Sequence, residues 1–143
     1  MTLAEDCAKA LWNDDRASAW LGFEIQEVTE GGAVVAMTVA PHHCNGFGIL
    51  HGGITFALAD SAFAFACNSR NQATVAQSNT ITYLAPGREG DRLIATAREV
   101  QLTGRTGLYD VTVTRSDKTV IAEFRGQSRA ISGTVIPEGG DAG

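Results

Sequence analysis

The sequence predicts an α+β fold in which a curved antiparallel β-sheet wraps around one central buried α-helix. Three observations lead to this prediction. Residues 54–68 read ITFALADSAFAFACN, an apolar run without Gly or Pro that is too long for a typical strand. A predicted strand hairpin precedes this run, and four segments with strand character follow it. A helix that is apolar on nearly every side needs such a wrapping, or a subunit interface, to remove it from water.

The first 22 residues are expected to be mainly helical. Thr2 and Glu5 have the spacing of a capping box, and an apolar stripe follows at Leu3, Cys7, Ala10 and Leu11. Polar residues 13–15 interrupt this stripe, a second short turn is expected after them, and Gly22 is expected to end it. Residues 23–25 then alternate apolar and polar, a turn follows at 29–32, and apolar residues recur at period two over 33–39. This pattern predicts a hairpin.

Residues 41–53 contain no convincing periodic element. They hold all three histidines of the chain, Asn45 and four glycines, and loops of this length in compact domains are often functional. After the apolar helix, four strands are predicted, over residues 74–84, 92–102, 108–114 and 120–129. We expect a single domain over residues 1–136, followed by a flexible tail over 137–143 that is rich in glycine and acidic residues.

The composition of the chain indicates a cytoplasmic protein. The early apolar stretch is interrupted by Glu5, Asp6 and Lys9, so it matches neither a signal peptide nor a membrane span, and no membrane partner is expected. The three cysteines are scattered and form no C-x-x-C pair, which argues against a disulfide framework or a structural zinc site. A net charge of −5 argues against nucleic acid as a partner, but leaves room for a phosphorylated ligand.

Asp60 is the anomaly of the apolar helix. An ionised carboxylate among Phe56, Leu58, Phe63 and Phe65 loses hydration, and burial raises its pKa towards the range in which a general base operates. The alternative is an ordinary helix carboxylate on a thin solvated stripe, or one that is bonded to a loop amide. Isolated carboxylates on such helices tend to mark functional sites.

His51, Gly52 and Gly53 stand directly before this helix. Two residues without side chains leave backbone N–H groups open to a ligand, and the helix dipole adds partial positive charge there. Amides placed in this way could polarise a carbonyl group and stabilise the oxyanion that develops from it. The alternative is a tight turn that needs glycine for its backbone angles. Because the Gly-Gly pair stands at the start of the helix that carries Asp60, we favour the interpretation in which these amides face a ligand.

The spacing of Gly52 and Asp60 predicts a subunit interface. The two residues are eight positions apart, which corresponds to about 12 Å along a straight helix. One carbonyl group cannot lie within about 3 Å of both the amide donor and the attacking group at that separation. Either the helix start is distorted, or donor and carboxylate come from different copies of the chain. Two antiparallel helices at a twofold axis would form two composite sites per dimer.

The same residues carry a family resemblance. The run Asn45-Gly46, His51-Gly52-Gly53, Leu58-Ala59-Asp60-Ser61-Ala62 and Ala66-Cys67-Asn68-Ser69 resembles the hotdog-fold acyl-CoA thioesterases of bacterial phenylacetate degradation. The similarity covers nearly the whole chain, including residues 83–87 and the last strand at 124–126. His-Gly-Gly followed by an acidic residue on the central helix is typical of this branch of thioesterases.

The resemblance implies a function and roles for residues. It implies a hotdog homodimer, usually paired into a homotetramer, that hydrolyses aryl-acetyl- or hydroxyphenylacetyl-CoA. Gly52 would polarise the thioester carbonyl, Asp60 would be the nucleophile or the general base, and Asn45 and His51 would support the site. A related branch has Glu at the acidic position and Thr one turn later, where this chain has Ala64. No metal or redox cofactor is expected, because water is the only co-substrate and coenzyme A belongs to the substrate.

The remaining candidate residues are weaker. We expect Gly53 and Phe47 to contact the substrate, and Arg88 and Arg105 to contact the CoA phosphates; Arg125 and Arg129 are further cations that could do so. A metal site among the adjacent residues His42, His43 and Cys44 is disfavoured, because neighbouring side chains at a strand end point in opposite directions. Cys44 and Cys67 are more typical of buried core thiols than of nucleophiles. For His51, a structural hydrogen bond and a catalytic role both remain open.

Two other functions fit the same plan. An enoyl-CoA hydratase or dehydratase would use a His–acid pair to move water and a proton across a carbon–carbon double bond. A non-catalytic acyl-CoA-binding protein would bind without turnover, and the acidic chain without an appended DNA-binding segment disfavours a regulatory sensor. The acyl group itself depends on side chains whose positions the sequence does not give.

Overall fold

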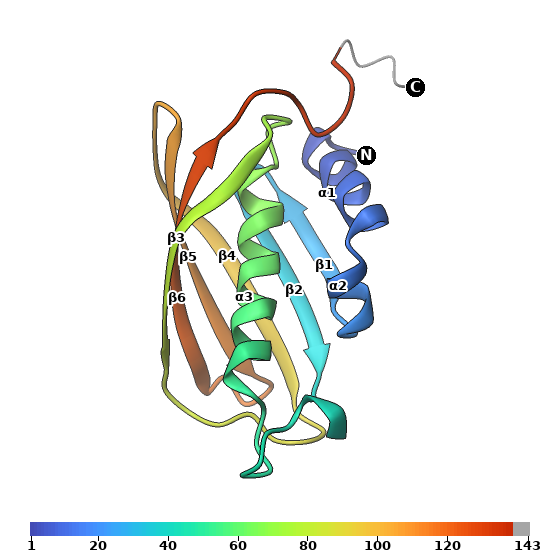
Figure 1. Cartoon of the computed structure of the whole chain (residues 1–143), viewed down its shortest axis with the longest axis vertical. Coiled ribbons are helices and arrows are strands. Elements are labelled where there is room, and N and C mark those ends of the chain that lie inside the picture. The colour runs from blue at the N-terminus through green and yellow to red at the C-terminus, as the bar shows by residue number, and fades with distance from the viewer. Residues whose placement is uncertain (139–143) are drawn as a thin grey trace.

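One long helix, α3 (Gly52–Cys67), lies against a curved sheet of six antiparallel strands (Figure 1). The computed structural model describes residues 1–138, and the predicted tail over 137–143 falls largely outside the described residues. The α3 helix begins at Gly52, two residues before the predicted apolar run, so both glycines are helical. The sheet wrapped around a central helix is the predicted hotdog plan, and the prediction of an α+β fold is confirmed.

The N-terminal region folds as its capping signals predict. Helix α1 (Leu3–Asp14) starts with the expected capping box, in which the Thr2 side chain accepts from the Glu5 amide at 3.1 Å and the Thr2 amide donates to the Glu5 carboxylate at 2.8 Å. Asp15 ends α1 and caps α2 (Arg16–Trp20), where its carboxylate accepts from the Ser18 amide at 3.0 Å. The two helices lie beside α3 in Figure 1.

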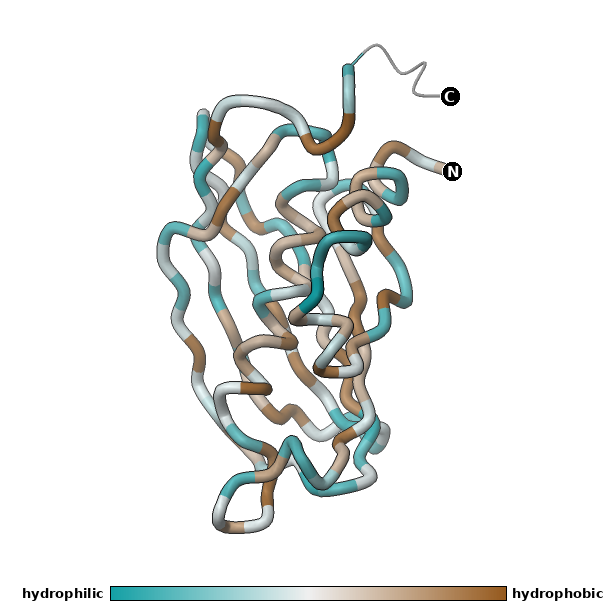
Figure 2. The backbone as a smooth tube through the Cα atoms, turned by 45° about the vertical axis from the view of Figure 1, so that its right-hand side comes forward, coloured by the Kyte–Doolittle hydropathy of each residue, from teal (hydrophilic) through white to brown (hydrophobic). Residues whose placement is uncertain are grey.

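The strands have the order β1-β2-β4-β5-β6-β3 across the sheet. Their bounds are Glu24–Thr29 for β1, Gly32–Thr38 for β2, Thr74–Tyr83 for β3, Arg92–Thr103 for β4, Thr106–Arg115 for β5 and Val120–Ala130 for β6. Along β5, buried residues alternate with more exposed ones, as expected for a sheet with one covered face. Figure 2 shows hydrophobic and hydrophilic positions alternating along the strands. Within the described chain, β3 pairs with one neighbour only, β6, and so forms an edge.

The predicted loop over residues 41–53 contains more structure than the sequence indicated. Pro41–His43 form one 3-10 turn, η1, and Cys44 forms an isolated bridge with Leu50. The short range of the backbone bonds explains why no periodic pattern was visible, since periodicity reports only on longer elements. These contacts fix the position of His51, the residue before α3.

Within one chain, α3 is buried on the side that faces the sheet and accessible on the other, so the sheet alone does not cover it and the alternative of a subunit interface stays open. The side that faces the sheet is buried, with Leu58, Ala59, Ala62 and Ala66 fully excluded from solvent. A strip of half-exposed residues runs along the other side: Phe56, Ala57, Asp60, Ser61 and Ala64. The sheet curves around only part of the helix circumference, so this strip stays accessible. None of the helices within residues 1–138 has the length and apolar character needed to cross a membrane.

Candidate active site

The start of α3 leaves one backbone amide open. His51 is the N-cap: its Nδ1 accepts from the Gly53 amide at 2.9 Å, and its carbonyl oxygen accepts from Ile54 and Thr55. The first four N–H groups of a helix have no partner inside the helix. Three of these four are bonded to His51, and the Gly52 amide has no hydrogen-bond partner among residues 1–138. Gly52 is therefore the available donor at the positive end of the helix dipole.

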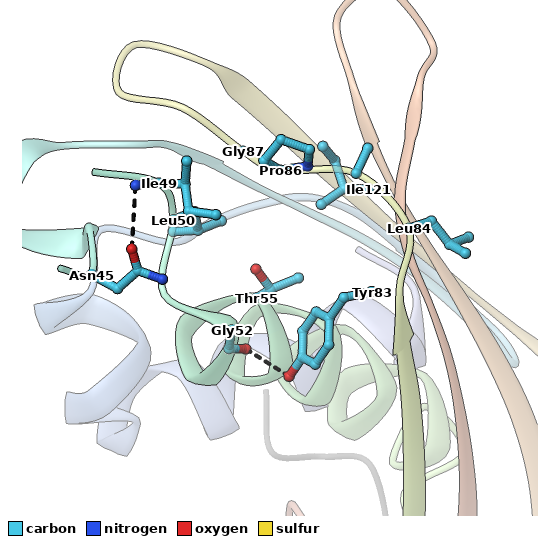
Figure 3. Close-up of a pocket in the computed structure, with 11 residues that line it drawn as sticks. Asn45, Ile49, Leu50, Gly52, Thr55, Tyr83, Leu84, Pro86, Gly87 and Ile121 are labelled. Atoms are coloured by element: carbon cyan, nitrogen blue, oxygen red, sulfur yellow. Dashed lines mark hydrogen bonds between the residues drawn. The ribbon is translucent and has the colours of Figure 1, made fainter. Parts of the chain in front are cut away.

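A cavity of about 420 Å³ opens beside this amide (Figure 3). Its walls come from the loop before α3, from the first turn of α3, from the end of β3 with the segment that follows it, and from the start of β6. The lining residues are Asn45, Ile49, Leu50, Gly52, Thr55, Tyr83, Leu84, Ala85, Pro86, Gly87 and Ile121.

The polar side chains that line this cavity are Asn45, Thr55 and Tyr83, and two of them, Asn45 and Tyr83, bond to backbone groups at its wall. Asn45 Oδ1 accepts from the Phe47 amide at 2.9 Å and closes the loop between Cys44 and Leu50, so the Asn45 side chain is fixed at the cavity wall. The Tyr83 hydroxyl donates to the Gly52 carbonyl oxygen at 2.9 Å. The Tyr83 ring also covers Gly52 closely, since a Cβ atom at Gly52 would lie 3.1 Å from Tyr83 Cζ. The absence of a side chain at Gly52 thus admits the ring.

Asp60 lies two turns further along α3, in different surroundings. Its side chain is half-buried and lines two cavities, of about 430 Å³ and about 210 Å³. Burial raises the pKa of the Asp60 carboxyl, and the charge of Asp15 raises it further. A hydrogen bond from Asn79 Nδ2 to Asp60 Oδ1, at 3.2 Å, acts in the opposite direction and lowers this pKa. The net effect is a carboxyl that holds its proton more strongly than an exposed aspartate.

The walls of the two cavities beside Asp60 differ in character. The larger one is mainly apolar and is lined by Leu11, Asp14, Asp15, Asp60, Phe63, Ala64, Phe65, Cys67, Asn68, Thr74, Val75 and Ala76. The smaller one lies between α2 and α3, where the Ser18 hydroxyl bonds to Asp15 at 2.7 Å and to Ser61 at 2.8 Å. Ser61 therefore points towards α2 and away from Asp60, since adjacent residues of a helix are rotated by about 100° around its axis.

A single chain keeps Gly52 and Asp60 apart. Helix α3 is continuous from Gly52 to Cys67, which excludes the distorted helix start that the sequence left open. Eight helical residues separate the two by about 12 Å along the axis. Gly52 lines one cavity and Asp60 lines two others, and none of these three is lined by both residues. We refer to the surroundings of Gly52 as the amide half of the candidate site and to those of Asp60 as its carboxylate half.

The other predicted contact residues lie at varied distances from these halves. The Gly53 amide is occupied by His51, and the Phe47 side chain is 90% exposed at the tip of its loop. Arg88 is exposed next to Gly87, which lines the cavity of the amide half. Arg105 lines a small cavity with Cys67 at the C-terminal end of α3, which is the end opposite to Gly52.

The two further cations that the sequence offered lie on β6. Arg125 is bonded to Asp110, with its Nε at 2.6 Å from Asp110 Oδ1, and Arg129 is exposed. Neither of them lines one of the three cavities described above.

His43 and Cys67 were candidates for a metal ligand and for a thiol nucleophile, and both have the environment of structural residues. His43 accepts from the Ala40 amide through Nδ1 and bonds to the Leu21 carbonyl through Nε2, so backbone groups occupy both ring nitrogens. Burial raises the pKa of the Cys67 thiol to about 12, which leaves it protonated at neutral pH. Within residues 1–138, no group of three or more His, Cys, Asp or Glu side chains is placed to hold a metal ion.

Three residues near the two halves were not predicted. Asn79 and Tyr83 lie in a segment that reads only as a strand, and Asp15 lies where the sequence indicates a helix break. A possible signal was the presence of a polar Asn and a Tyr on a strand next to the apolar helix. The sequence does not give the sheet order, however, so nothing indicated that β3 would lie alongside α3.

Comparison with known proteins places these features in a family. The thioesterase superfamily pattern matches residues 47–122, which include Gly52, Asp60, Asn79 and Tyr83. Acyl-coenzyme A thioesterase PaaI of Escherichia coli (strain K12) is 44% identical and is aligned over 92% of this chain and 94% of its own length.

Solved structures agree with this assignment. The structure of the E. coli PaaI protein from the phenylacetic acid degradation operon covers 92% of this chain and 96% of that chain, with a TM-score of 0.91 and 43% identity. A Streptococcus mutans protein bound to acetyl CoA covers 79% of this chain and 90% of its own, with a TM-score of 0.75 and 28% identity. The expectation of a hotdog-fold thioesterase is confirmed, and the chain belongs to the thioesterase superfamily.

Proposed function

We propose that this chain hydrolyses an acyl-CoA thioester to a free acid and CoA. The observation that carries the proposal is the pair of half-sites on α3: an open amide at the helix start and a half-buried carboxylate with a raised pKa. An amide donor stabilises the oxyanion that develops when a thioester carbonyl is attacked. A carboxylate with a raised pKa is a more effective base near neutral pH than an ordinary aspartate. The name of the E. coli relative and the acetyl CoA in the S. mutans structure support CoA thioesters as substrates.

In the proposed reaction, the thioester carbonyl oxygen accepts a hydrogen bond from the Gly52 amide. Asp60 then acts in one of two ways. As a general base it takes a proton from water while the water oxygen bonds to the carbonyl carbon; the carbon–sulfur bond breaks and the proton passes to the departing thiolate. As a nucleophile, its carboxylate oxygen bonds to the carbonyl carbon, the carbon–sulfur bond breaks, and CoA leaves as a thiolate that takes a proton from solvent; water then hydrolyses the acyl–Asp60 anhydride, which releases the acid and regenerates Asp60. Single-turnover hydrolysis in ¹⁸O-labelled water tests for the nucleophilic route, since label enters the Asp60 carboxylate only when water attacks the Asp60 carbonyl of an anhydride.

We propose that the two half-sites combine across a dimer. The 12 Å between Gly52 and Asp60 on a straight helix is about four times the reach of one reacting carbonyl group. The half-exposed strip of α3, which includes Asp60, and the unpaired edge of β3 are surfaces that a second copy could cover. Gly52 of one copy would then serve Asp60 of the other, and two equivalent sites would form. We further propose that two such dimers pair into a homotetramer.

We propose an aryl-acetyl or hydroxyphenylacetyl group as the acyl part. The larger cavity at Asp60 is bordered by Phe63, Phe65 and Leu11, which suit a flat apolar ring. The operon named for the E. coli relative supports the same class. A turnover panel of aryl-acetyl, medium-chain and short-chain acyl-CoAs tests it, and a preference for the short chains by kcat/KM would contradict it. Release of free thiol separates hydrolysis from hydration of an enoyl-CoA, which leaves CoA attached.

The Asp60→Asn variant tests the assignment of the carboxylate. We expect kcat to fall by about a thousandfold, because the amide neither accepts the proton nor attacks, while substrate still binds. Ser61→Ala is the matched control, since Ser61 is the next residue on α3 and its hydroxyl bonds to Ser18 instead. Near-normal thiol release by Asp60→Asn would overturn the proposed function.

The composite site is tested by complementation of two inactive variants. Gly52→Pro removes the amide donor and Asp60→Asn removes the carboxylate. A mixed dimer of these two chains contains one site with both defects and one site with none. Coexpression of the two variants should therefore restore roughly a quarter of wild-type activity if subunits pair at random. No recovery in isolated mixed dimers would show that both groups come from one chain.

A further inference from the structure

The edge strand β3 reaches both halves of the site with side chains on one face. Asn79 donates from Nδ2 to Asp60 Oδ1 at 3.2 Å, and the Tyr83 hydroxyl donates to the Gly52 carbonyl oxygen at 2.9 Å. These two residues are four positions apart on a strand, which spans about 13 Å. The residues they contact are eight positions apart on a helix, which spans about 12 Å. The two spacings match, so one strand can hold both groups at once.

A β-bulge turns these side chains towards α3. The pairing of β3 with β6 shifts between Ala76 and Ser78, where Gln77 is the extra residue. Ala76 lies opposite Ser128 before the shift, and Asn79 lies opposite Gly126 after it. Directly opposed residues share a face of the sheet.

The residues of β6 opposite these positions show which face this is. Ser128, Gly126, Phe124 and Ala122 are buried on the helix side. Tyr83 pairs with Ala122, on the same face as Asn79. Without the extra residue, Asn79 or Ala76 would lie on the opposite face, since a one-residue slip exchanges the faces of a strand.

The environment of Asn79 differs from that of the structural asparagines in the chain. Asn68 bonds through Nδ2 to the carbonyls of Ala64 and Thr74 and through Oδ1 to the Thr74 amide, so it ties α3 to β3. Asn71 likewise bonds backbone groups through both ends of its amide.

Asn79 has no backbone partner of this kind. Its nitrogen bonds to Asp60, and its buried Oδ1 has no hydrogen-bond partner among residues 1–138. A buried amide with one unpaired end contributes little to folding stability. The contact with Asp60 is therefore its distinguishing interaction.

We propose that Asn79 and Tyr83 are positioning residues of the thioesterase site, Asn79 for the Asp60 carboxylate and Tyr83 for the first turn of α3 that carries the Gly52 amide. This inference rests on the proposed function. Asn79 fixes the side-chain torsion of Asp60 and stabilises its charged form by donating to it. Tyr83 anchors the Gly52–Gly53 peptide from the side of the cavity, which fixes the direction of the neighbouring Gly52 amide.

The pH dependence follows from the groups that face Asp60. From the α1–α2 junction these are Asp14 and Asp15, from α3 the thiol of Cys67, and from β3 the neutral Asn79. Among the residues that line its two cavities there is no Lys, Arg or His. Asn79 is thus the donor that offsets the burial of the carboxylate.

Replacement of Asn79 tests the first part of the proposal. Asn79→Leu removes the donor and raises the pKa of Asp60, so the acidic limb of the kcat/KM profile should move to higher pH. Asn79→Asp has nearly the same shape and adds a like charge, so it should move the limb further in the same direction. At neutral pH we expect kcat to fall about tenfold for Asn79→Leu, as for the loss of one charge-assisted hydrogen bond. A purely structural asparagine would change the melting temperature and leave the limb in place.

Replacement of Tyr83 tests the second part. Tyr83→Phe keeps the ring over Gly52 and removes the hydroxyl, and kcat should fall about fivefold with the acidic limb unmoved. Thr80→Ala is the control for both residues, because Thr80 is exposed on the same strand and lies next to Asn79.

The outcomes separate this inference from the proposed function. An unmoved limb in both Asn79 variants, or an unchanged kcat in Tyr83→Phe, overturns the inference alone if the wild type is active and Asp60→Asn is inactive. A wild type that releases no thiol overturns the proposed function itself.

Discussion

The two halves of the proposed site are built from different parts of the chain. The amide half uses backbone groups: Gly52 supplies an N–H at a helix start, and His51 occupies the neighbouring amides. The carboxylate half uses side chains from three separate elements, with Asp60 from α3, Asn79 from β3 and Asp15 from the α1–α2 junction. The first half therefore depends on local conformation and the second on tertiary packing. Substitutions should affect the amide half through geometry and the carboxylate half through charge.

In the amide half, the largest difference should appear between two substitutions of Gly52. Proline at the first position of a helix is well tolerated, and His51 has the extended backbone angles, φ −62° and ψ 130°, that suit a following proline. Gly52→Pro removes the amide donor, while Gly52→Ala keeps it and makes a similar contact with the Tyr83 ring. We expect kcat of Gly52→Pro to be about 100-fold below that of Gly52→Ala, the effect of one oxyanion donor. Equal activity of the two would remove the amide from the mechanism.

In the carboxylate half, Asp15→Asn should shift the acidic limb of the kcat/KM profile by less than the Asn79 variants do, and in the opposite direction. The negative charge of Asp15 raises the pKa of Asp60. Its removal lowers this pKa, so Asp60 is deprotonated at lower pH and the acidic limb of kcat/KM should move down. Asn also caps a helix well, so α2 should keep its start. A limb that moves up, measured with the same acyl-CoA, would contradict the electrostatic account of this half.

Substitutions of His51 test whether the amide half depends only on residues that are neighbours along the chain. His51→Ala removes the Nδ1 acceptor from the Gly53 amide and should lower the free energy of unfolding by about 1 kcal/mol, as for other N-caps. His51→Asn supplies another N-cap side chain and should recover most of this loss. Urea unfolding monitors the stability, and thiol release monitors kcat in parallel. If His51→Asn restores stability but not turnover, His51 also acts in the chemistry.

The smallest effect is expected outside both halves, at Arg125. Its side chain forms an exposed ion pair with Asp110 on the sheet and lines none of the cavities of the site. Exposed pairs contribute about 0–1 kcal/mol to stability. We therefore expect Arg125→Gln to leave KM for acyl-CoA within about twofold of the wild type. A large rise in KM would identify Arg125 as a contact of the CoA phosphates.

The sequence predicted the amide half better than the carboxylate half, and the cause is the range of the interactions. His51, Gly52 and the start of α3 are neighbours along the chain, so capping chemistry and helix geometry describe them. The Asp60 anomaly was visible as a charge in an apolar run, but its partners lie 19 and 45 positions away along the chain. Their contact depends on the position of β3 at the sheet edge and on the α1–α2 junction. The position of the accessible strip on α3 depends on tertiary structure in the same way, since composition does not show how far a sheet curves.

The bulge at Gln77 has a consequence for how this sequence can change over generations. The Gln77 side chain is exposed, so most replacements of this residue should be neutral. Deletion of the residue is a different event, because it would bring the neighbours of Asn79 and Tyr83 to face α3 in their place. The number of residues in this strand is thus constrained, whereas the identity of residue 77 is not. Natural drift in this strand should show many substitutions at position 77 and very few gaps.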